Sequence, residues 1–178
     1  MIACVFDTET TGLVENRTMT LTKQPEIIEF YGCVADLATG AIIDELDFLI
    51  CPSRLPLPDK IVKITGIGDA DLDGKPSFKD VSPQIFSMLE QAPLVIAHNA
   101  SFDRDMVEIE SERLGVQIKW PRLVCTVEAT IAVKGYRLTL SALHEELFGE
   151  PFKGAHRAKA DVAALLRCCV ELHKRDMI

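Results

Sequence analysis

The sequence predicts an α/β protein in which helices flank a mixed sheet of three antiparallel strands followed by parallel strands. Two observations predict this fold class. Three runs rich in strand-forming residues follow one another early in the chain, at residues 2–6, 27–36 and 41–51. After residue 77, compact apolar runs alternate with segments whose apolar residues recur at helical spacing. Consecutive strands joined by short turns pair antiparallel, whereas strands that alternate with helices form parallel pairs.

The first three expected strands differ in how each one ends. Residues 2–6 form a short apolar run that ends at Asp7, so we expect a strand whose end delivers side chains into a pocket. Gly12 then breaks this strand, and residues 13–23 are typical of a polar loop. The tetrapeptide Leu-Ala-Thr-Gly at residues 37–40 is short enough to join the second and third strands as a hairpin.

The remainder of the chain alternates helices and strands. Residues 78–91 predict a helix, because Val81, Ile85 and Met88 would share one face. The other expected elements are a strand at 94–98, a helix at 102–114, a strand at 123–126 and helices at 138–148 and 158–173, preceded by a proline-rich loop at 52–58 and a short segment at 61–66. No repeat or linker interrupts this order, so we expect one domain over residues 1–178.

Composition excludes several classes of protein. Hydrophobic residues make up 48% of the 178 residues and charged residues 26%, as in ordinary globular proteins. No apolar run approaches the roughly 20 residues that span a bilayer. The N-terminal run reaches a carboxylate too soon for a signal peptide, which predicts a cytoplasmic protein. The six cysteines form no C-x-x-C pair, so we expect reduced thiols rather than disulfides or a zinc site.

The net charge of −8 is unevenly distributed. Residues 1–112 hold 8 Lys/Arg and 20 Asp/Glu, whereas residues 113–159 hold 8 and 4. A locally positive stretch can hold a phosphate backbone although the whole chain is acidic. The alternative is a solvated surface of mixed charge. The overall acidity argues against tight binding over a long footprint and favours a grip on a few nucleotides at a strand end.

The first candidate site motif is Asp7-Thr-Glu9, at the end of the first strand. Residues i and i+2 of a strand point to the same face, so the two carboxylates project together and repel unless a cation lies between them. Hard oxygen ligands suit Mg²⁺ or Mn²⁺. Gly12 brings the backbone close to whatever binds. The alternative is an ordinary acidic strand end.

The second and third motifs supply two further carboxylates and a base. Asp103, in His98-Asn-Ala-Ser-Phe-Asp103, follows a strand and begins a helix; alone it could equally be a charge that complements the helix dipole. Asp161 begins the last helix, and His156 precedes it in a loop, where an imidazole can take a proton from water at neutral pH. Together the motifs predict metal-assisted cleavage of a phosphodiester bond. The other histidines, His144 and His173, are expected to be structural or surface residues.

The three motifs, in order, resemble those of the DEDDh (DnaQ-like) 3′→5′ exonucleases, a family that includes the epsilon proofreading subunit of bacterial DNA polymerase III. The likeness covers nearly the whole chain, through the segments 7–13, 64–67, 97–103, 125–126, 138–143 and 154–161. His156 is typical of the histidine branch of this superfamily rather than the tyrosine branch.

The resemblance implies an RNase H-like fold and a two-metal mechanism with Mg²⁺ or Mn²⁺. In that scheme Asp7 bridges two ions, whereas Glu9 and Asp161 bind the ion that holds the nucleophilic water. Asp103 helps to hold the second ion, and His156 is the general base. The products would be nucleoside 5′-monophosphates released from a 3′ end, as expected of a nuclease in DNA replication, repair or proofreading.

The resemblance also implies substrate contacts and partners. The expected contacts are Thr10, Thr11, Gly12 and Leu13 with the terminal nucleotide, Asn99 with the substrate, and Ile64 or Ile67 with the terminal bases. Lys159 stands where many relatives are apolar, and meets either phosphate or solvent. The expected ligands are nucleic acid 3′ ends, single-stranded, and relatives include dimers. The sequence ends at Ile178 without the tail by which epsilon engages its polymerase, so we expect a stand-alone exonuclease or one that docks by another surface.

Three functional hypotheses remain. The leading one is a DNA 3′→5′ exonuclease. The second is an RNA 3′-end exoribonuclease of the same family. The two substrates differ in the 2′-OH of RNA, and no residue of the sequence can be identified as a contact for that group. The third is a catalytically silent module that binds nucleic acid. The presence of suitable side chains at all five catalytic positions argues against the third hypothesis.

Overall fold

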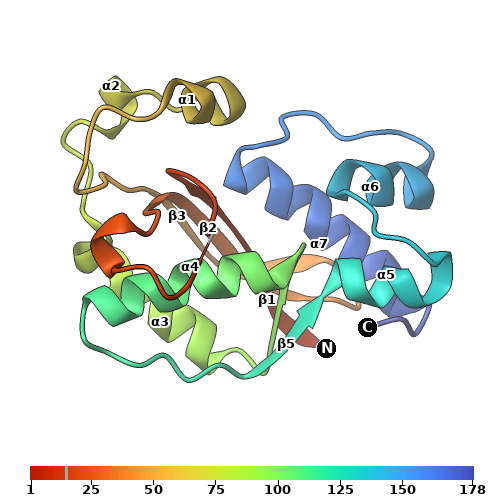
Figure 1. Cartoon of the computed structure of the whole chain (residues 1–178). Helices are drawn as coiled ribbons and strands as arrows, with labels where there is room; N and C mark the ends of the chain where they lie inside the picture. The colour runs from red at the N-terminus through yellow and green to blue at the C-terminus, as the bar shows by residue number, and fades with distance from the viewer. Residues whose placement is uncertain (15) are drawn as a thin grey trace.

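A five-stranded sheet in the order β3-β2-β1-β4-β5 forms the centre of the computed structural model, which describes residues 1–14 and 16–178 (Figure 1). The strands are β1 (Ile2–Thr10), β2 (Ile27–Asp36), β3 (Ala41–Leu49), β4 (Leu94–Ala97) and β5 (Arg122–Cys125). The first three pair antiparallel, whereas β4 pairs parallel with both β1 and β5. The predicted fold class is therefore confirmed. Within the loop expected at 13–23, residue 15 lies outside the described residues.

Helices cover both faces of the sheet. They are a 3₁₀ turn at Leu21–Lys23, α1 (Asp59–Thr65), α2 (Asp69–Leu72), α3 (Phe78–Gln91), α4 (Ala100–Arg113), α5 (Thr126–Lys134), α6 (Leu140–Phe148) and α7 (Ala158–Lys174). Helices α3 and α4 lie on one face, and α7, with α6 beside it, lies on the other (Figure 1). Among the described residues, no helix is both long enough and apolar enough to cross a membrane.

The two cores result from the alternation of side chains along β1. Cys4 and Phe6 are buried against α3 and α4, whereas Ala3 and Val5 are buried against α7. The same alternation continues beyond the apolar run, because β1 stays paired with β2 through Thr10. The odd-numbered polar residues at the end of β1 are therefore directed to the face that α7 covers.

The structure differs from the sequence expectations at several helices, among them the short α2, which no sequence pattern predicts. Residues 126–134 form helix α5, which the sequence pattern does not predict, and the short segment expected at 61–66 belongs to helix α1. Both helices end at a glycine with a positive φ, of 78° at Gly135 and 71° at Gly66, where a side chain would be strained.

All six cysteines are free thiols, and burial raises the pKa of Cys168 to about 12.

Candidate active site

The predicted carboxylates converge at the end of β1. Asp7 and Glu9 lie on the face of β1 that α7 covers, and Asp161 lies in the first turn of α7. Each of the three offers a carboxylate oxygen, and these oxygens all lie within 4.8 Å of one another. The packing of α7 against β1, through residues such as Val162 and Leu165, fixes this approach.

Asp103 reaches the site from the opposite side of β1. Thr8 points to the α4 face, and both its backbone N–H and its hydroxyl donate hydrogen bonds to Oδ1 of Asp103, at 3.1 and 2.8 Å. Asp103 is only 2% exposed. Its oxygens lie outside the three-carboxylate cluster, but its charge raises the pKa of Asp7. Asp7 and Glu9 thus reach the site from the α7 side of β1, whereas Thr8 holds Asp103 on the α4 side.

The electrostatics of the carboxylates fit a cation. Burial, together with the charges of the neighbouring carboxylates, raises the pKa of Asp7 well above its usual range. Burial raises the pKa of Glu9 to about 8, of Asp103 to about 7 and of Asp161 to about 6. Crowded carboxylates of this kind either hold protons or share a divalent ion. The all-oxygen donor set fits Mg²⁺ or Mn²⁺ rather than a soft metal.

His156 lies at the rim of the same cluster. Its φ of 68° turns the chain sharply just before α7, and its backbone N–H donates to Oδ2 of Asp161 at 2.9 Å. A cleft of about 580 Å³ contains Asp7, Asp161 and His156 in its wall, together with the apolar side chains of Leu138 and Phe152. The general base expected from the sequence and two of the expected metal ligands therefore face one cavity.

His98 is a structural anchor of this cleft rather than a second base. Its Nε2 lies 3.1 Å from the carbonyl oxygen of Leu138 and its Nδ1 lies 2.9 Å from Oγ1 of Thr126. A carbonyl only accepts, so Nε2 carries the hydrogen and Nδ1 accepts from the threonine hydroxyl. Burial lowers the pKa of His98 to about 4, which keeps the ring neutral. His98 thus ties the segment before α6 to the end of β4.

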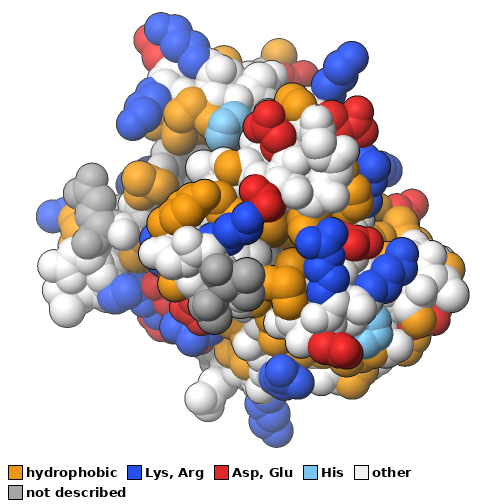
Figure 2. Space-filling view, turned by 90° about the vertical axis from the view of Figure 1, so that its right-hand side faces the viewer, with side chains coloured by type: hydrophobic (Ala, Val, Ile, Leu, Met, Phe, Trp, Pro, Cys, Tyr) orange, Lys and Arg blue, Asp and Glu red, His pale blue; other side chains and the backbone are white. Residues whose placement is uncertain are grey.

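Arg137 is a cleft residue that the sequence motifs do not single out. Its Nη2 donates to Oδ1 of Asn99 at 2.7 Å, and Asn99 itself has a φ of 64°. Asn99, expected to contact substrate, therefore holds a cation at the edge of the cleft. The only sequence signal for Arg137 is its membership of the basic stretch at 113–159. On the face that includes α5 and α6, cationic side chains are interspersed with carboxylates (Figure 2).

The remaining expected substrate contacts fall into two groups. Thr10 donates from Oγ1 to the carbonyl of Gly12 at 2.7 Å, and Thr11 accepts at Oγ1 from the N–H of Glu26 at 2.9 Å, so both hydroxyls shape the turn. Leu13 is 72% exposed and borders a second hollow of about 470 Å³.

The two isoleucines expected near the terminal bases are placed differently. Ile64 is 41% exposed on α1, whereas Ile67 is 1% exposed and packs with Ile28, Leu57 and Leu72. Ile67 is thus a core residue, because its side chain has no surface to offer a base. Only Ile64 is kept as a proposed contact.

Comparison with known proteins identifies the group to which this site belongs. The model of a family described as an exonuclease, RNase_T, matches residues 4–168, a range that includes all four carboxylates and His156. The chain belongs to the RNase_T exonuclease family. The chain matches the DEDDh pattern at Asp7, Glu9, Asp103, His156 and Asp161.

Proteins that are similar to this chain in sequence include DNA polymerase III proteins. The chain is 34% identical over 173 residues to the DNA polymerase III subunit epsilon of Treponema pallidum, covering 94% of this chain and 72% of the relative. It is 34% identical over 158 residues to the PolC-type DNA polymerase III of Thermotoga maritima, covering 88% of this chain and 11% of the relative. The chain thus spans about a tenth of the PolC-type relatives that it matches.

Solved structures share the fold. The nuclease domain of 3′hExo, described as a DEDDh family member bound to rAMP, superposes with a TM-score of 0.79 at 17% identity, covering 98% of this chain and 92% of that one. Exonuclease X in complex with 5′ overhanging duplex DNA gives a TM-score of 0.70 at 24% identity, covering 98% and 93%. The RNase H-like exonuclease fold expected from the sequence is confirmed.

Proposed function

We propose that this protein is a metal-dependent 3′→5′ exonuclease that hydrolyses the phosphodiester bond at DNA 3′ ends and releases nucleoside 5′-monophosphates. The observation that carries the proposal is the cluster of Asp7, Glu9 and Asp161 oxygens within 4.8 Å of one another, in a cleft that His156 borders. Membership of the exonuclease family supports it.

The chain's own residues have distinct parts in the proposed reaction. Asp7, Glu9 and Asp161 would hold one divalent ion, and Asp7 with Asp103 a second. When bound, the two ions would make water more acidic and stabilise charge on the attacking and leaving oxygens. His156 takes the proton from the attacking water. Thr8 holds the Asp103 carboxylate in place with its two hydrogen bonds.

DNA is the proposed substrate because the relatives cited above are DNA polymerase III proteins. Their names also make association with a DNA polymerase part of the proposal. A single-stranded 3′ end suits the cleft, because Phe152, which is half-buried in its wall, offers apolar surface to an unpaired base. The second candidate, an exoribonuclease, differs only in the sugar that the site accepts.

A time course on 5′-labelled single-stranded DNA and RNA of one sequence tests the proposal. We expect a ladder that shortens from the 3′ end with Mg²⁺ or Mn²⁺, and no shortening with EDTA. Faster shortening of RNA than of DNA would assign the exoribonuclease function instead. No shortening of either polymer with either metal, followed by none on very short oligonucleotides, would overturn the proposal.

Arg137 is expected to bind a substrate phosphate. Its side chain borders the cleft near Asp7 and Asp161, where an anionic strand needs a cation. We expect Arg137→Ala to raise KM about tenfold, the usual size of a charge-assisted hydrogen bond, with kcat nearly unchanged. The slope of log(kcat/KM) against log[salt] should become shallower by about 0.7, the value for one phosphate contact on a single strand.

The matched control for this prediction is Arg175→Ala. Arg175 lies just beyond the end of α7 and bonds Glu171, far along that helix from the cleft residues. The control substitution removes one positive charge from the protein without touching the cleft, and should leave the salt slope unchanged. An equal slope for wild type and Arg137→Ala would show that Arg137 makes no phosphate contact.

A further inference from the structure

A fifth acidic side chain, Glu29, lies beside the four expected carboxylates. It stands on β2 directly opposite Glu9 in the antiparallel register, so it shares the face that α7 covers. Its side chain is only 3% exposed. Nothing in the sequence motifs singles it out, and its place near the site is known only once β1 and β2 are paired.

The oxygens of Glu29 are committed to the start of α7. Nε of Arg157 donates to both oxygens, at 3.1 and 3.2 Å, and Nη2 donates to Oε1 at 2.7 Å. The backbone N–H of Ala158 donates to Oε2 at 2.9 Å. This two-pronged ion pair explains why Glu29 is distinct from the metal-binding set, because its charge is already matched by a guanidinium.

Glu29 binds the backbone at the start of α7 as well as the charged side chain of Arg157. Arg157 is the residue that precedes α7, and it makes no side-chain cap of its own helix. Glu29 caps that helix from the neighbouring strand instead, through the N–H of Ala158. His156 is adjacent to this anchor and has a left-handed φ, a conformation that non-glycine residues hold only when their surroundings enforce it.

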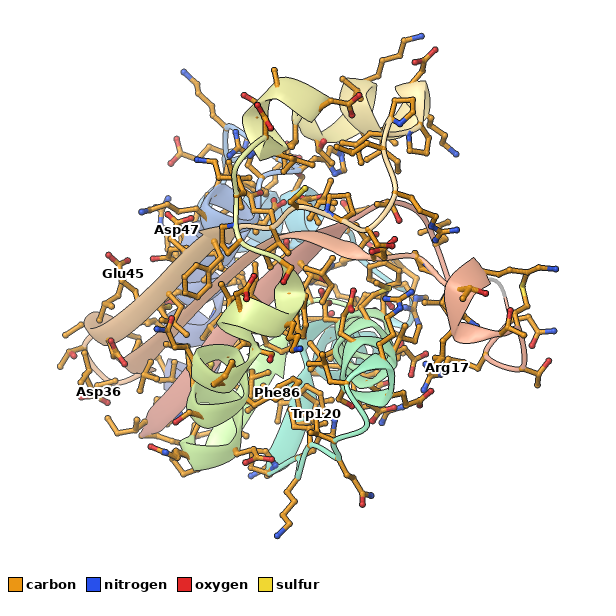
Figure 3. All side chains as sticks on the ribbon, turned by 90° about the vertical axis from the view of Figure 1, so that its left-hand side faces the viewer. Arg17, Asp36, Glu45, Asp47, Phe86 and Trp120 are labelled. Carbon is orange, nitrogen blue, oxygen red and sulfur yellow. The ribbon has the colours of Figure 1, made fainter. Side chains whose placement is uncertain are left out.

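Two fixed points therefore define the turn that carries His156. One is the hydrogen bond from the N–H of His156 to Asp161, and the other is the Glu29–Arg157 ion pair. Lys159, two residues further along, is also tied to the sheet, with its Nζ 3.0 Å from Oδ2 of Asp47. Asp47 lies on β3, an edge strand of the sheet, and is labelled in Figure 3.

We propose that Glu29 and Arg157 are positioning residues, whose ion pair docks the first turn of α7 on β2 and fixes the His156 imidazole relative to the carboxylates. The inference rests on the proposed exonuclease function. Of the two alternatives that the sequence leaves open for the basic stretch, it favours a surface of mixed charge around the third motif, because Arg157 and Lys159 are both paired with sheet carboxylates.

A double-mutant cycle on kcat tests this role. Glu29→Gln keeps the shape of the side chain and an oxygen for Ala158 but removes the charge that holds Arg157. We expect kcat to fall about 10- to 100-fold, because a displaced imidazole loses part of a general-base contribution of about 100- to 10,000-fold, with KM within twofold of wild type. In a His156→Ala background, the same change should lower kcat less than twofold further, because the group it positions is gone.

Two further variants separate positioning from folding. Arg157→Ala should lose kcat as Glu29→Gln does and regain part of it with millimolar guanidinium ion, which a merely unfolded protein would not. Asp47→Asn is the matched control, because it breaks the exposed pair with Lys159 on the same helical turn and should leave kcat within twofold.

The outcomes distinguish the inference from the proposed function. A fall in kcat that is equally large in the His156→Ala background would overturn the inference, as would an effect confined to KM. Failure of guanidinium to rescue Arg157→Ala, in a variant whose helix content equals that of wild type, would also count against it. Absence of any cleavage by the wild-type protein would overturn the exonuclease function and, with it, the role that depends on it.

Discussion

Replacing Asp7 by asparagine is expected to abolish cleavage and, at the same time, to raise the thermal stability of the metal-free protein. Asp7 contributes to the three-carboxylate cluster and would help to hold both of the proposed ions, so kcat should fall at least about 1,000-fold. In the absence of metal, burial and the neighbouring carboxylates make the charge of Asp7 unfavourable. The amide removes that cost while keeping the size of the side chain.

Kinetics and thermal unfolding of Asp7→Asn at pH 8 check both parts. In EDTA we expect a rise in Tm, because the raised pKa of Asp7 means that its ionised form is less stable in the folded protein than in the unfolded chain. Asp44→Asn, which removes an exposed carboxylate from β3, should change neither quantity. Retained cleavage, or a Tm that falls in EDTA, would contradict the assignment of Asp7.

The metal-free protein is expected to lose stability as the pH rises, and divalent metal is expected to restore it. Burial raises the pKa of Glu9 to about 8 and of Asp103 to about 7, so the folded protein holds protons that the unfolded chain has already released. Stability therefore falls between about pH 4, the unfolded pKa of a carboxyl group, and about pH 8. A bound cation favours the ionised carboxylates and offsets this fall.

Thermal unfolding from pH 5 to pH 8, with EDTA or with saturating Mn²⁺, measures this dependence. In EDTA we expect Tm to drop by at least about 5 °C over this range, and Mn²⁺ to raise Tm more at pH 8 than at pH 5. Asp7→Asn should flatten the curve in EDTA, since it removes one of the interacting charges. A Tm in EDTA that rises with pH, or a metal effect larger at pH 5, would contradict the prediction.

The sequence predicts the fold class and the face of β1 on which Asp7 and Glu9 lie, but it does not predict every helix. The spacing of Asp7 and Glu9 depends only on the two-residue period of a strand, and the structure directs both to the face that α7 covers. Helix α5 escapes prediction because its sequence, Thr-Val-Glu-Ala-Thr-Ile at the start, is rich in β-branched residues that favour strands. Its helical form depends on its place after β5 and on Gly135 at its end.

Contacts between distant segments cannot be predicted from local pattern. Glu29 and Arg157 are separated by 128 residues. They meet only because β2 lies beside β1 in the sheet and α7 packs on the face of both strands toward which Glu29 points. For the same reason, the sequence alone leaves open whether Arg157 binds phosphate or belongs to a surface of mixed charge. The sequence leaves open whether Ile64 or Ile67 contacts the terminal bases, and only the packing of α1 and α2 near the start of β2 shows that Ile67 is buried with Ile28.

The two faces of β1 hold different parts of the candidate site, and this limits the sequence changes that the protein can tolerate. Asp7 and Glu9 face α7, whereas Thr8 between them holds Asp103 on the α4 side. Substitutions along the strand alter one side at a time. Insertion or deletion of a single residue would exchange the sides, turning the carboxylates toward α4 and the threonine toward α7. We therefore expect active variants of this protein to keep the number of residues between the apolar run of β1 and Gly12, even where single residues in this segment are substituted.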